Sequence, residues 1–271
     1  MKKQKAALAD FTENNLPHNR WQVFKDIIKQ RYDVLLKIGV ILFLFLLPYL
    51  IITLLGDITY NAMGEETSRE EFAYIDTVIS LVNIGPLALL GLGLSGAWKI
   101  IRNLVWGEPI FFRENFFSGL RQNRLIFVFV FLILGLVDFL LSYLQVLIPD
   151  DLIRTIITAL CFVFLIPVAM YLLSAAVLYK DGFWALLKSS VVFFIKTAPI
   201  SLAFALFFVG IWFIGFIELF IVKVIVAMVS ITIMFPVYLV GWTLYSYSVF
   251  DKMVNSTLYP DYVDKGIYRI K

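Results

Sequence analysis

The chain has 271 residues, of which 61% are hydrophobic and 16% charged, and its formal net charge is +3. Soluble domains contain roughly 25% charged residues, so this composition and a mean hydropathy of +0.88 exclude an ordinary water-soluble fold. The single cysteine, Cys161, excludes an intramolecular disulfide, and the single histidine, His18, excludes a multi-histidine metal site.

The N-terminal 33 residues are polar and charged. They lack an apolar core followed by a small-residue cleavage site, so we expect an uncleaved anchor rather than a signal peptide. Trp21, Phe24 and Ile28 recur at helical spacing among basic residues, which is typical of an amphipathic helix lying at the level of the lipid headgroups. We therefore assign residues 1–33 to a tail that contains a basic amphipathic helix.

Six apolar stretches follow this tail. A membrane crossing takes about 20 mostly apolar residues, because the hydrocarbon layer is about 30 Å thick. The six stretches are Val34–Leu55, Ile75–Ile101, Leu125–Ile148, Leu152–Leu178, Thr197–Phe216 and Ile221–Phe250. The sequence thus predicts an all-α polytopic membrane protein, with a six-helix domain over residues 34–250 and a C-terminal tail over residues 251–271.

The basic residues predict the orientation of these helices. Of the 23 Lys and Arg residues, all but Arg69, Arg154 and Lys223 fall in the tails, at the start of the first span, or in and beside the second and fourth connections. Such an excess of Lys and Arg on one side of the membrane predicts that both termini are cytoplasmic. The positive charge is therefore explained by membrane topology and not by nucleic-acid binding. The acidic connection Gly56–Tyr74 lacks the ligand spacing of a calcium loop, so a solvated face is expected there.

A basic amphipathic segment precedes an apolar hairpin three times. These segments are Arg20–Lys37, Glu108–Arg124 and Asp181–Lys196. The pattern predicts three hairpin-like repeats, each led by a helix at the cytoplasmic surface. Their common orientation favours parallel repeats over the inverted repeats of many secondary transporters.

One acidic residue, Asp138, lies well inside a predicted span. Four other polar residues are expected at a similar depth, namely Asn83, Thr158, Ser230 and Thr232. A charge at such a depth costs at least about 2.5–3.5 kcal/mol, so Asp138 needs a reason to be there. Two interpretations remain open: a proton- or solute-coupled site, or a protonated Asp138 that holds helices together through hydrogen bonds.

The second span is rich in small residues and contains a proline. Gly85, Pro86, Gly91, Gly93 and Gly96 predict a kink or close helix packing, and hence a central position in the bundle. Proline occurs in five of the six spans, where it can form hinges around a path or simply be tolerated.

No motif in the sequence carries an enzymatic reaction. The phosphate-binding GxxxxGK[ST] pattern, the zinc-binding HExxH pattern and the nucleophile pattern GxSxG are all missing. We therefore expect no catalytic residues, no metal site, no cofactor and no enzymatic activity.

The second span and the connection after it carry a family resemblance. The residues concerned are Gly85-Pro86, Gly91, Trp98-Lys99, Arg102-Asn103, Trp106-Gly107-Glu108, Phe111-Phe112-Arg113-Glu114-Asn115-Phe116-Phe117 and Arg121-Gln122-Asn123. They resemble the YesL-like family of bacterial membrane proteins (domain of unknown function six-two-four), over residues 21–250. The long charged N-terminal tail and the acidic first outer connection depart from that family.

The resemblance implies a bacterial plasma-membrane protein associated with carbohydrate uptake, particularly with ATP-binding-cassette sugar transporters. It brings no established catalytic residues. The first hypothesis is therefore a non-enzymatic accessory or regulatory protein whose partners are the lipid bilayer and other membrane proteins, such as a sugar transporter complex. The alternative is a self-contained transporter or channel with a polar site around Asp138.

Overall fold

The computed structural model describes residues 16–63, 68–148, 150–212 and 220–268. Within these ranges the chain forms helices and no strands. The first 15 residues of the predicted tail, the end of the predicted fifth span at Phe216, the outer turn at Glu218 and residues 269–271 lie outside the described part.

Helix α2 (Arg20–Gln30) is the amphipathic helix predicted in the tail. It begins at Asn19, whose side chain accepts a hydrogen bond from the backbone N–H of Gln22, and such a cap stabilises a helix start. Val23 and Ile27 are buried, whereas Trp21 and Lys25 face outward. The helix is therefore attached to the bundle along one apolar stripe.

Six helical spans follow, as the sequence predicts. They are α3 (Tyr32–Ala62), α4 (Arg69–Val105), α5 (Phe112–Leu147), α6 (Asp151–Leu178), α7 (Phe183–Trp212) and a last span built from α8 (Phe220–Val229), η3 (Ser230–Met234) and α9 (Phe235–Phe250). Each is long and apolar enough to cross a membrane. The chain continues through η4 (Asp251–Asn255), α10 (Ser256–Leu258) and η5 (Pro260–Tyr262).

One of the three predicted surface segments is not a separate helix. The segment Glu108–Arg124 enters α5 at Phe112 and continues into the span without a break, and no proline lies within the helix to interrupt it. The segment Asp181–Lys196 is joined to its span through a kink at Thr197, two residues before Pro199. Proline removes a backbone donor and clashes with the preceding turn, which accounts for the kink.

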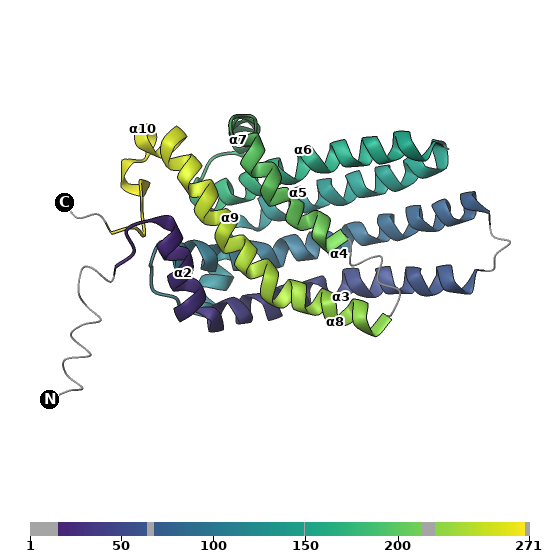
Figure 1. The fold of residues 1–271 in the computed structure, drawn as a ribbon, viewed down its shortest axis with the longest axis horizontal. Coiled ribbons are helices and arrows are strands. Elements are labelled where there is room, and N and C mark those ends of the chain that lie inside the picture. Colours follow the sequence, from purple (N-terminus) through teal and green to yellow (C-terminus); the bar gives the residue numbers. More distant parts are fainter. Residues whose placement is uncertain (1–15, 64–67, 149, 213–219, 269–271) are drawn as a thin grey trace.

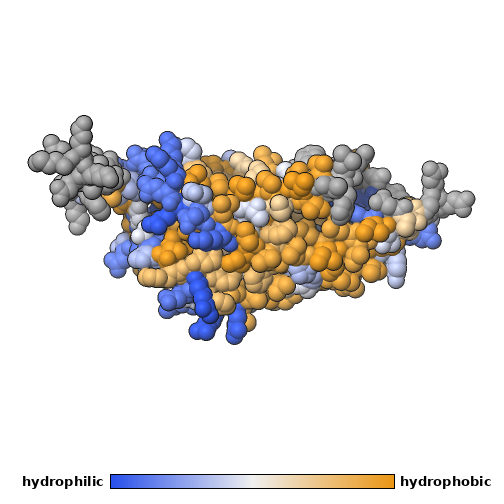
Figure 2. All heavy atoms as spheres, turned by 90° about the horizontal axis from the view of Figure 1, so that it is seen from below, coloured by the Kyte–Doolittle hydropathy of each residue, from blue (hydrophilic) through white to orange (hydrophobic). Residues whose placement is uncertain are grey.

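The two ends of the bundle differ in what they contain. Both described ends of the chain lie at one end, together with the connections α4–α5 and α6–α7 (Figure 1). We call this the terminal end, and the opposite one the far end. Hydrophilic residues gather at the terminal end and an apolar belt covers the middle of the bundle (Figure 2). The hairpins α3–α4 and α5–α6 extend beyond α7 and α8 toward the far end (Figure 1).

The largest buried side chains form a core toward the terminal end. Trp98, Trp242, Tyr171, Phe127 and Phe250 are almost fully buried. The indole N–H of Trp242 donates to the hydroxyl of Ser174 at 2.9 Å and lies 3.2 Å from the carbonyl oxygen of Met170. This bond satisfies a polar group that would otherwise be costly to bury.

Glycines allow α4 to approach its neighbours closely. A Cβ on Gly91 would lie 2.8 Å from Phe131, and one on Gly96 would lie 2.7 Å from Phe116, both on α5. A Cβ on Gly93 would lie 2.6 Å from Phe45 of α3. A Cβ on Gly85, which precedes Pro86 inside the helix, would meet no atom within 4 Å. Close helix packing is therefore found at Gly91, Gly93 and Gly96 and not at Gly85.

Candidate functional site

Polar side chains of α3, α4 and α5 form a group inside the far half of the bundle. The amide nitrogen of Asn83 on α4 lies 3.4 Å from the hydroxyl of Thr53 on α3. Asp138 on α5 lies within electrostatic range of Tyr49 on α3 and of Asp76 on α4. Of the five residues predicted to share a polar layer, Asn83 therefore bonds to the α3 segment that contains Tyr49 and Thr53, and Asp138 lies near it.

Asn83 carries an unsatisfied oxygen in this group. Its side chain is 3% exposed, and its Oδ1 atom has no hydrogen-bond partner among the described residues. A buried acceptor without a donor costs roughly 1–3 kcal/mol. The position could therefore accept a hydrogen bond from a bound group or a water molecule.

The other three predicted residues lie elsewhere. Ser230 and Thr232 belong to η3, where the hydroxyl of Thr232 donates to the carbonyl of Met228 at 2.7 Å. The backbone oxygen of Thr232 faces Gly39 of α3, where a Cβ would lie only 2.0 Å away. Thr158 is half-buried on α6 and, within the described ranges, forms no side-chain hydrogen bond with the other four residues. Among the described residues, no side-chain hydrogen bond therefore joins Thr158, Ser230 or Thr232 to Asn83 or Asp138.

Three charged residues near this group, Asp57, Asp76 and Lys223, were not predicted from the sequence as site residues. The hydroxyl of Tyr60 donates to Asp76, and the ammonium of Lys223 on α8 lies 2.9 Å from a carboxylate oxygen of Asp57 on α3. The spacing of seven residues between Asp76 and Asn83, which places both on one face of a helix, is the signal that could have identified Asp76.

A second polar group ties the two described ends of the chain together at the terminal end. Arg20 of α2 forms an ion pair with Asp251, which also accepts a bond from the backbone N–H of Asp264 at 3.0 Å. Asn255 donates to Asp251 at 2.7 Å and accepts from the hydroxyl of Tyr179 at 2.7 Å. Burial lowers the pKa of the Arg20 guanidinium, while its bond with Asp251 acts in the opposite direction.

The residues of the family resemblance join this terminal group. Glu108 lies 2.9 Å from the ammonium of Lys265 and 3.4 Å from the guanidinium of Arg102. The ammonium of Lys265 also lies 3.7 Å from the ring centre of Trp106, which is a cation–π contact. Burial alone would raise the pKa of the Glu108 carboxyl. The bond from Lys265 and the nearby positive charges outweigh burial and hold that pKa below its usual value.

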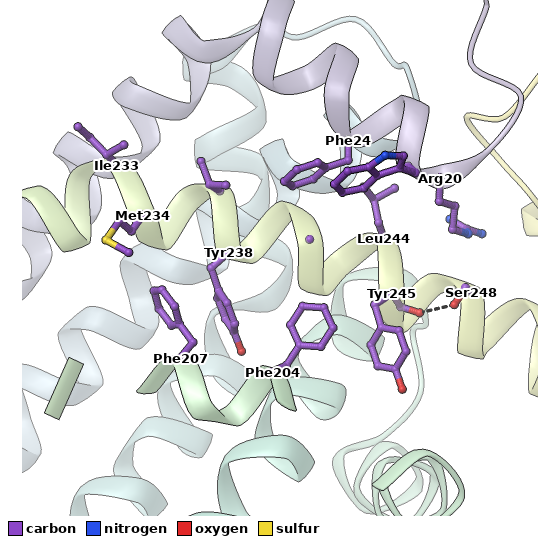
Figure 3. A pocket seen from close by; sticks show the side chains of 13 residues that line it. Arg20, Phe24, Phe204, Phe207, Ile233, Met234, Tyr238, Leu244, Tyr245 and Ser248 are labelled. Carbon is purple, nitrogen blue, oxygen red and sulfur yellow. Dashed lines mark hydrogen bonds between the residues drawn. The ribbon is translucent and has the colours of Figure 1, made fainter. Parts of the chain in front are cut away.

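An apolar groove of about 750 Å³ runs along α9 between α2 and α7. Phe24 comes from α2, Phe204 and Phe207 come from α7, and Tyr238 and Tyr245 come from α9 (Figure 3). The rings of Phe207 and Tyr238 are stacked, with centres 4.2 Å apart. Arg20 lies at one end of the groove and is its charged residue (Figure 3).

Among the described residues, no three His, Cys, Asp or Glu side chains gather closely enough to hold a metal ion. No protein-family model, curated protein or solved structure matches the chain. The structure therefore offers three candidate sites: the polar group around Asp138, the terminal group around Asp251 and Glu108, and the apolar groove.

Proposed function

We propose that this multi-pass membrane protein is a non-enzymatic accessory component that binds another membrane protein complex through its terminal end. The observation that carries the proposal is the terminal group. Ion pairs and buried hydrogen bonds join α2, the α4–α5 connection and residues 251–268 into one fixed surface. A surface of fixed shape loses little conformational freedom on binding a partner.

The terminal end is proposed to face the cytoplasm of a bacterium, at its plasma membrane. Twenty of the 23 Lys and Arg residues belong to this end by sequence, as the positive-inside rule requires. Trp21 and Trp184 are exposed near it, at 62% and 71%. Exposed tryptophans and lysines are typical of the boundary between hydrocarbon and headgroups.

The expected partner is a carbohydrate uptake complex of the ATP-binding-cassette type. This expectation rests on the resemblance to the YesL-like family and on the residues that carry it. Four of those residues, Arg102, Asn103, Trp106 and Glu108, lie in or beside the terminal group. Their position supports a role in shaping the surface that the partner would contact.

Site-specific cross-linking in cells tests this proposal. A photo-reactive amino acid would replace Trp184 at the terminal end or, as a matched control, Leu152, which is 68% exposed at the far end. We expect adducts with subunits of a sugar transporter from position 184 and not from position 152. Adducts with lipid alone at both positions, together with recovery of the protein alone in mild detergent, would contradict the proposal.

Ion translocation is a second candidate function. It is supported by the group of Asp138, Asp76 and Tyr60, and by the unsatisfied oxygen of Asn83. Intramembrane ionisable residues commonly mark ion or proton pathways. In proteoliposomes that contain the purified protein and a pH-sensitive dye, Asp138→Asn should abolish proton flux and the exposed control Asp33→Asn should not. Absence of flux in the wild-type protein would exclude proton translocation.

A further inference from the structure

The apolar groove along α9 is open to the side of the bundle. Its lining residues are Arg20, Trp21, Phe24, Phe204, Phe207, Ile233, Met234, Val237, Tyr238, Gly241, Leu244, Tyr245 and Ser248. Trp21 near one end and Ile233 and Met234 near the other are exposed. Apart from Arg20 and Ser248 its lining is apolar and aromatic, so the groove suits an apolar occupant, and lipid tails around a membrane protein supply one.

The groove is narrow at Gly241, in its floor. A Cβ there would lie 3.8 Å from a ring carbon of Phe204 on α7 and 3.8 Å from a ring carbon of Phe24 on α2. A single hydrocarbon chain is the slimmest apolar group that a bilayer supplies, so it suits a passage lined by these two rings.

The length of the groove matches one leaflet of a bilayer. Ser248 and Ile233 lie near its two ends, and the backbone of η3 and α9 between them rises roughly 22 Å at about 1.5 Å per residue. One leaflet contributes about 15 Å of the hydrocarbon thickness. Helix α9 crosses the bundle obliquely (Figure 1), so the groove covers less depth than its length along the helix.

Cationic side chains lie near the terminal end of the groove. Arg20 lines it, and one nitrogen of its guanidinium pairs with Asp251 and lies 4.0 Å from a carboxylate oxygen of Asp264, whereas a guanidinium has five N–H donors. Lys25 is exposed beside Trp21, with its ammonium 5.3 Å from the ring centre. Lys252 is exposed one turn beyond Ser248. A phosphate at this end would meet cations from both α2 and the end of α9.

We propose that the groove binds one acyl chain of an anionic phospholipid from the leaflet at the terminal end, with its phosphate beside Arg20 and Lys25. The apolar walls bury the chain, and the cations select the charge of the headgroup. Gly241 keeps the middle of the groove open. The proposal goes beyond the accessory function, because lipid binding here needs no protein partner.

Photo-labelling of the full-length protein in nanodiscs tests the site. The probe is phosphatidylglycerol with a photo-reactive group on one acyl chain. We expect labelled peptides from α9 and from the second half of α7. In Gly241→Leu, labelling of these peptides should fall about tenfold, which corresponds to roughly 1.4 kcal/mol of binding free energy.

Two further variants serve as controls. Gly85→Leu changes a glycine around which nothing lies within 4 Å, so labelling of the groove should be unchanged. Gly241→Ala adds one carbon at ordinary contact distance and should fold. If Gly241→Leu does not fold, Gly241→Ala takes its place, and labelling should then lie between that of the wild type and a tenfold loss.

The headgroup is tested separately. With labelled phosphatidylcholine in place of phosphatidylglycerol, labelling should be several-fold weaker. This difference should disappear in the double variant Lys25→Ala, Lys252→Ala. Equal labelling by the two lipids would overturn the selection of an anionic headgroup. Equal labelling of wild type and Gly241→Leu, or cross-links from the groove to a second protein chain, would overturn the lipid site itself.

Discussion

The terminal and far halves of the bundle pack their side chains differently. Near the terminal end, consecutive residues of α4, α6 and α9 are buried, including Gly93–Trp98 and Met170–Leu178. Toward the far end, α6 exposes Leu152, Ile156 and Leu160, one on each successive turn. Lipid tails are as apolar as leucine, so exposing such side chains to a bilayer costs little. The fold is therefore specified mainly by the terminal half, and the far half relies on lipid.

Removing a large buried side chain from the terminal half should have the largest effect. Trp242→Ala should lower the free energy of unfolding by about 3–5 kcal/mol, because it leaves a cavity and removes the donor to Ser174. Leu160→Ala, in the far half, should change it by less than about 1 kcal/mol. Unfolding in a graded series of denaturing detergent measures both. Equal losses would contradict the difference between the halves.

Inserting a side chain between α4 and α5 should have a smaller effect. Gly96→Leu should destabilise the protein by about 1–3 kcal/mol, because its Cβ alone would lie 2.9 Å from the carbonyl oxygen of Phe116. Gly85→Leu, in the same helix, should stay within about 0.5 kcal/mol of wild type, because its Cβ meets open space. Thermal aggregation in detergent would rank the two variants. The reverse order would exclude close packing at Gly96.

Lowering the pH should weaken the contacts of the terminal group, and this is the smallest of the three expected effects on stability. The pKa of Glu108 in the folded protein lies below its usual value of 4.5, so its ionised form stabilises the fold. That stabilisation is present above pH 4.5 and is lost as the pH falls from there through the lower folded pKa. Limited proteolysis near Lys265 should accelerate over this range in the wild type.

Lys265→Gln is the matched variant for the pH experiment. Glutamine cannot supply the charge that Glu108 pairs with, so cleavage should be faster already at neutral pH and should change less on acidification. An identical pH profile in the two proteins would show that the pair with Glu108 does not hold residues 251–268.

The number and order of the spans could be predicted from the sequence, because apolar length alone determines them. Charge did not predict the helix ends. Residues Phe112–Arg124 carry several charged and polar side chains yet belong to the same helix as the span that follows. The kink at Thr197 could be anticipated only from Pro199, and tolerated prolines look the same in a sequence.

The candidate sites depended on how the helices face one another. Depth in the membrane suggested that Thr158 and Ser230 would join Asp138, but depth does not specify the direction in which a side chain points. The pairs Tyr60–Asp76 and Asp57–Lys223 join different helices, and single-span patterns do not reveal them. Likewise, nothing in the composition of residues 251–271 indicated that Lys265 would reach Glu108.

The contact between the two described ends of the chain has a consequence for biosynthesis. The backbone N–H of Tyr268 donates to the carbonyl of Pro17 at 2.8 Å. Gly266, with φ of +88°, fits against the carbonyl of Val105, where a Cβ would lie 2.2 Å away. Translation delivers α9 and these residues after the five earlier spans, at about 5–20 residues per second. A nascent chain stalled before Trp242 therefore leaves Tyr171 without its contact to Trp242, and leaves Trp106 without its contacts to Tyr247 and Tyr262.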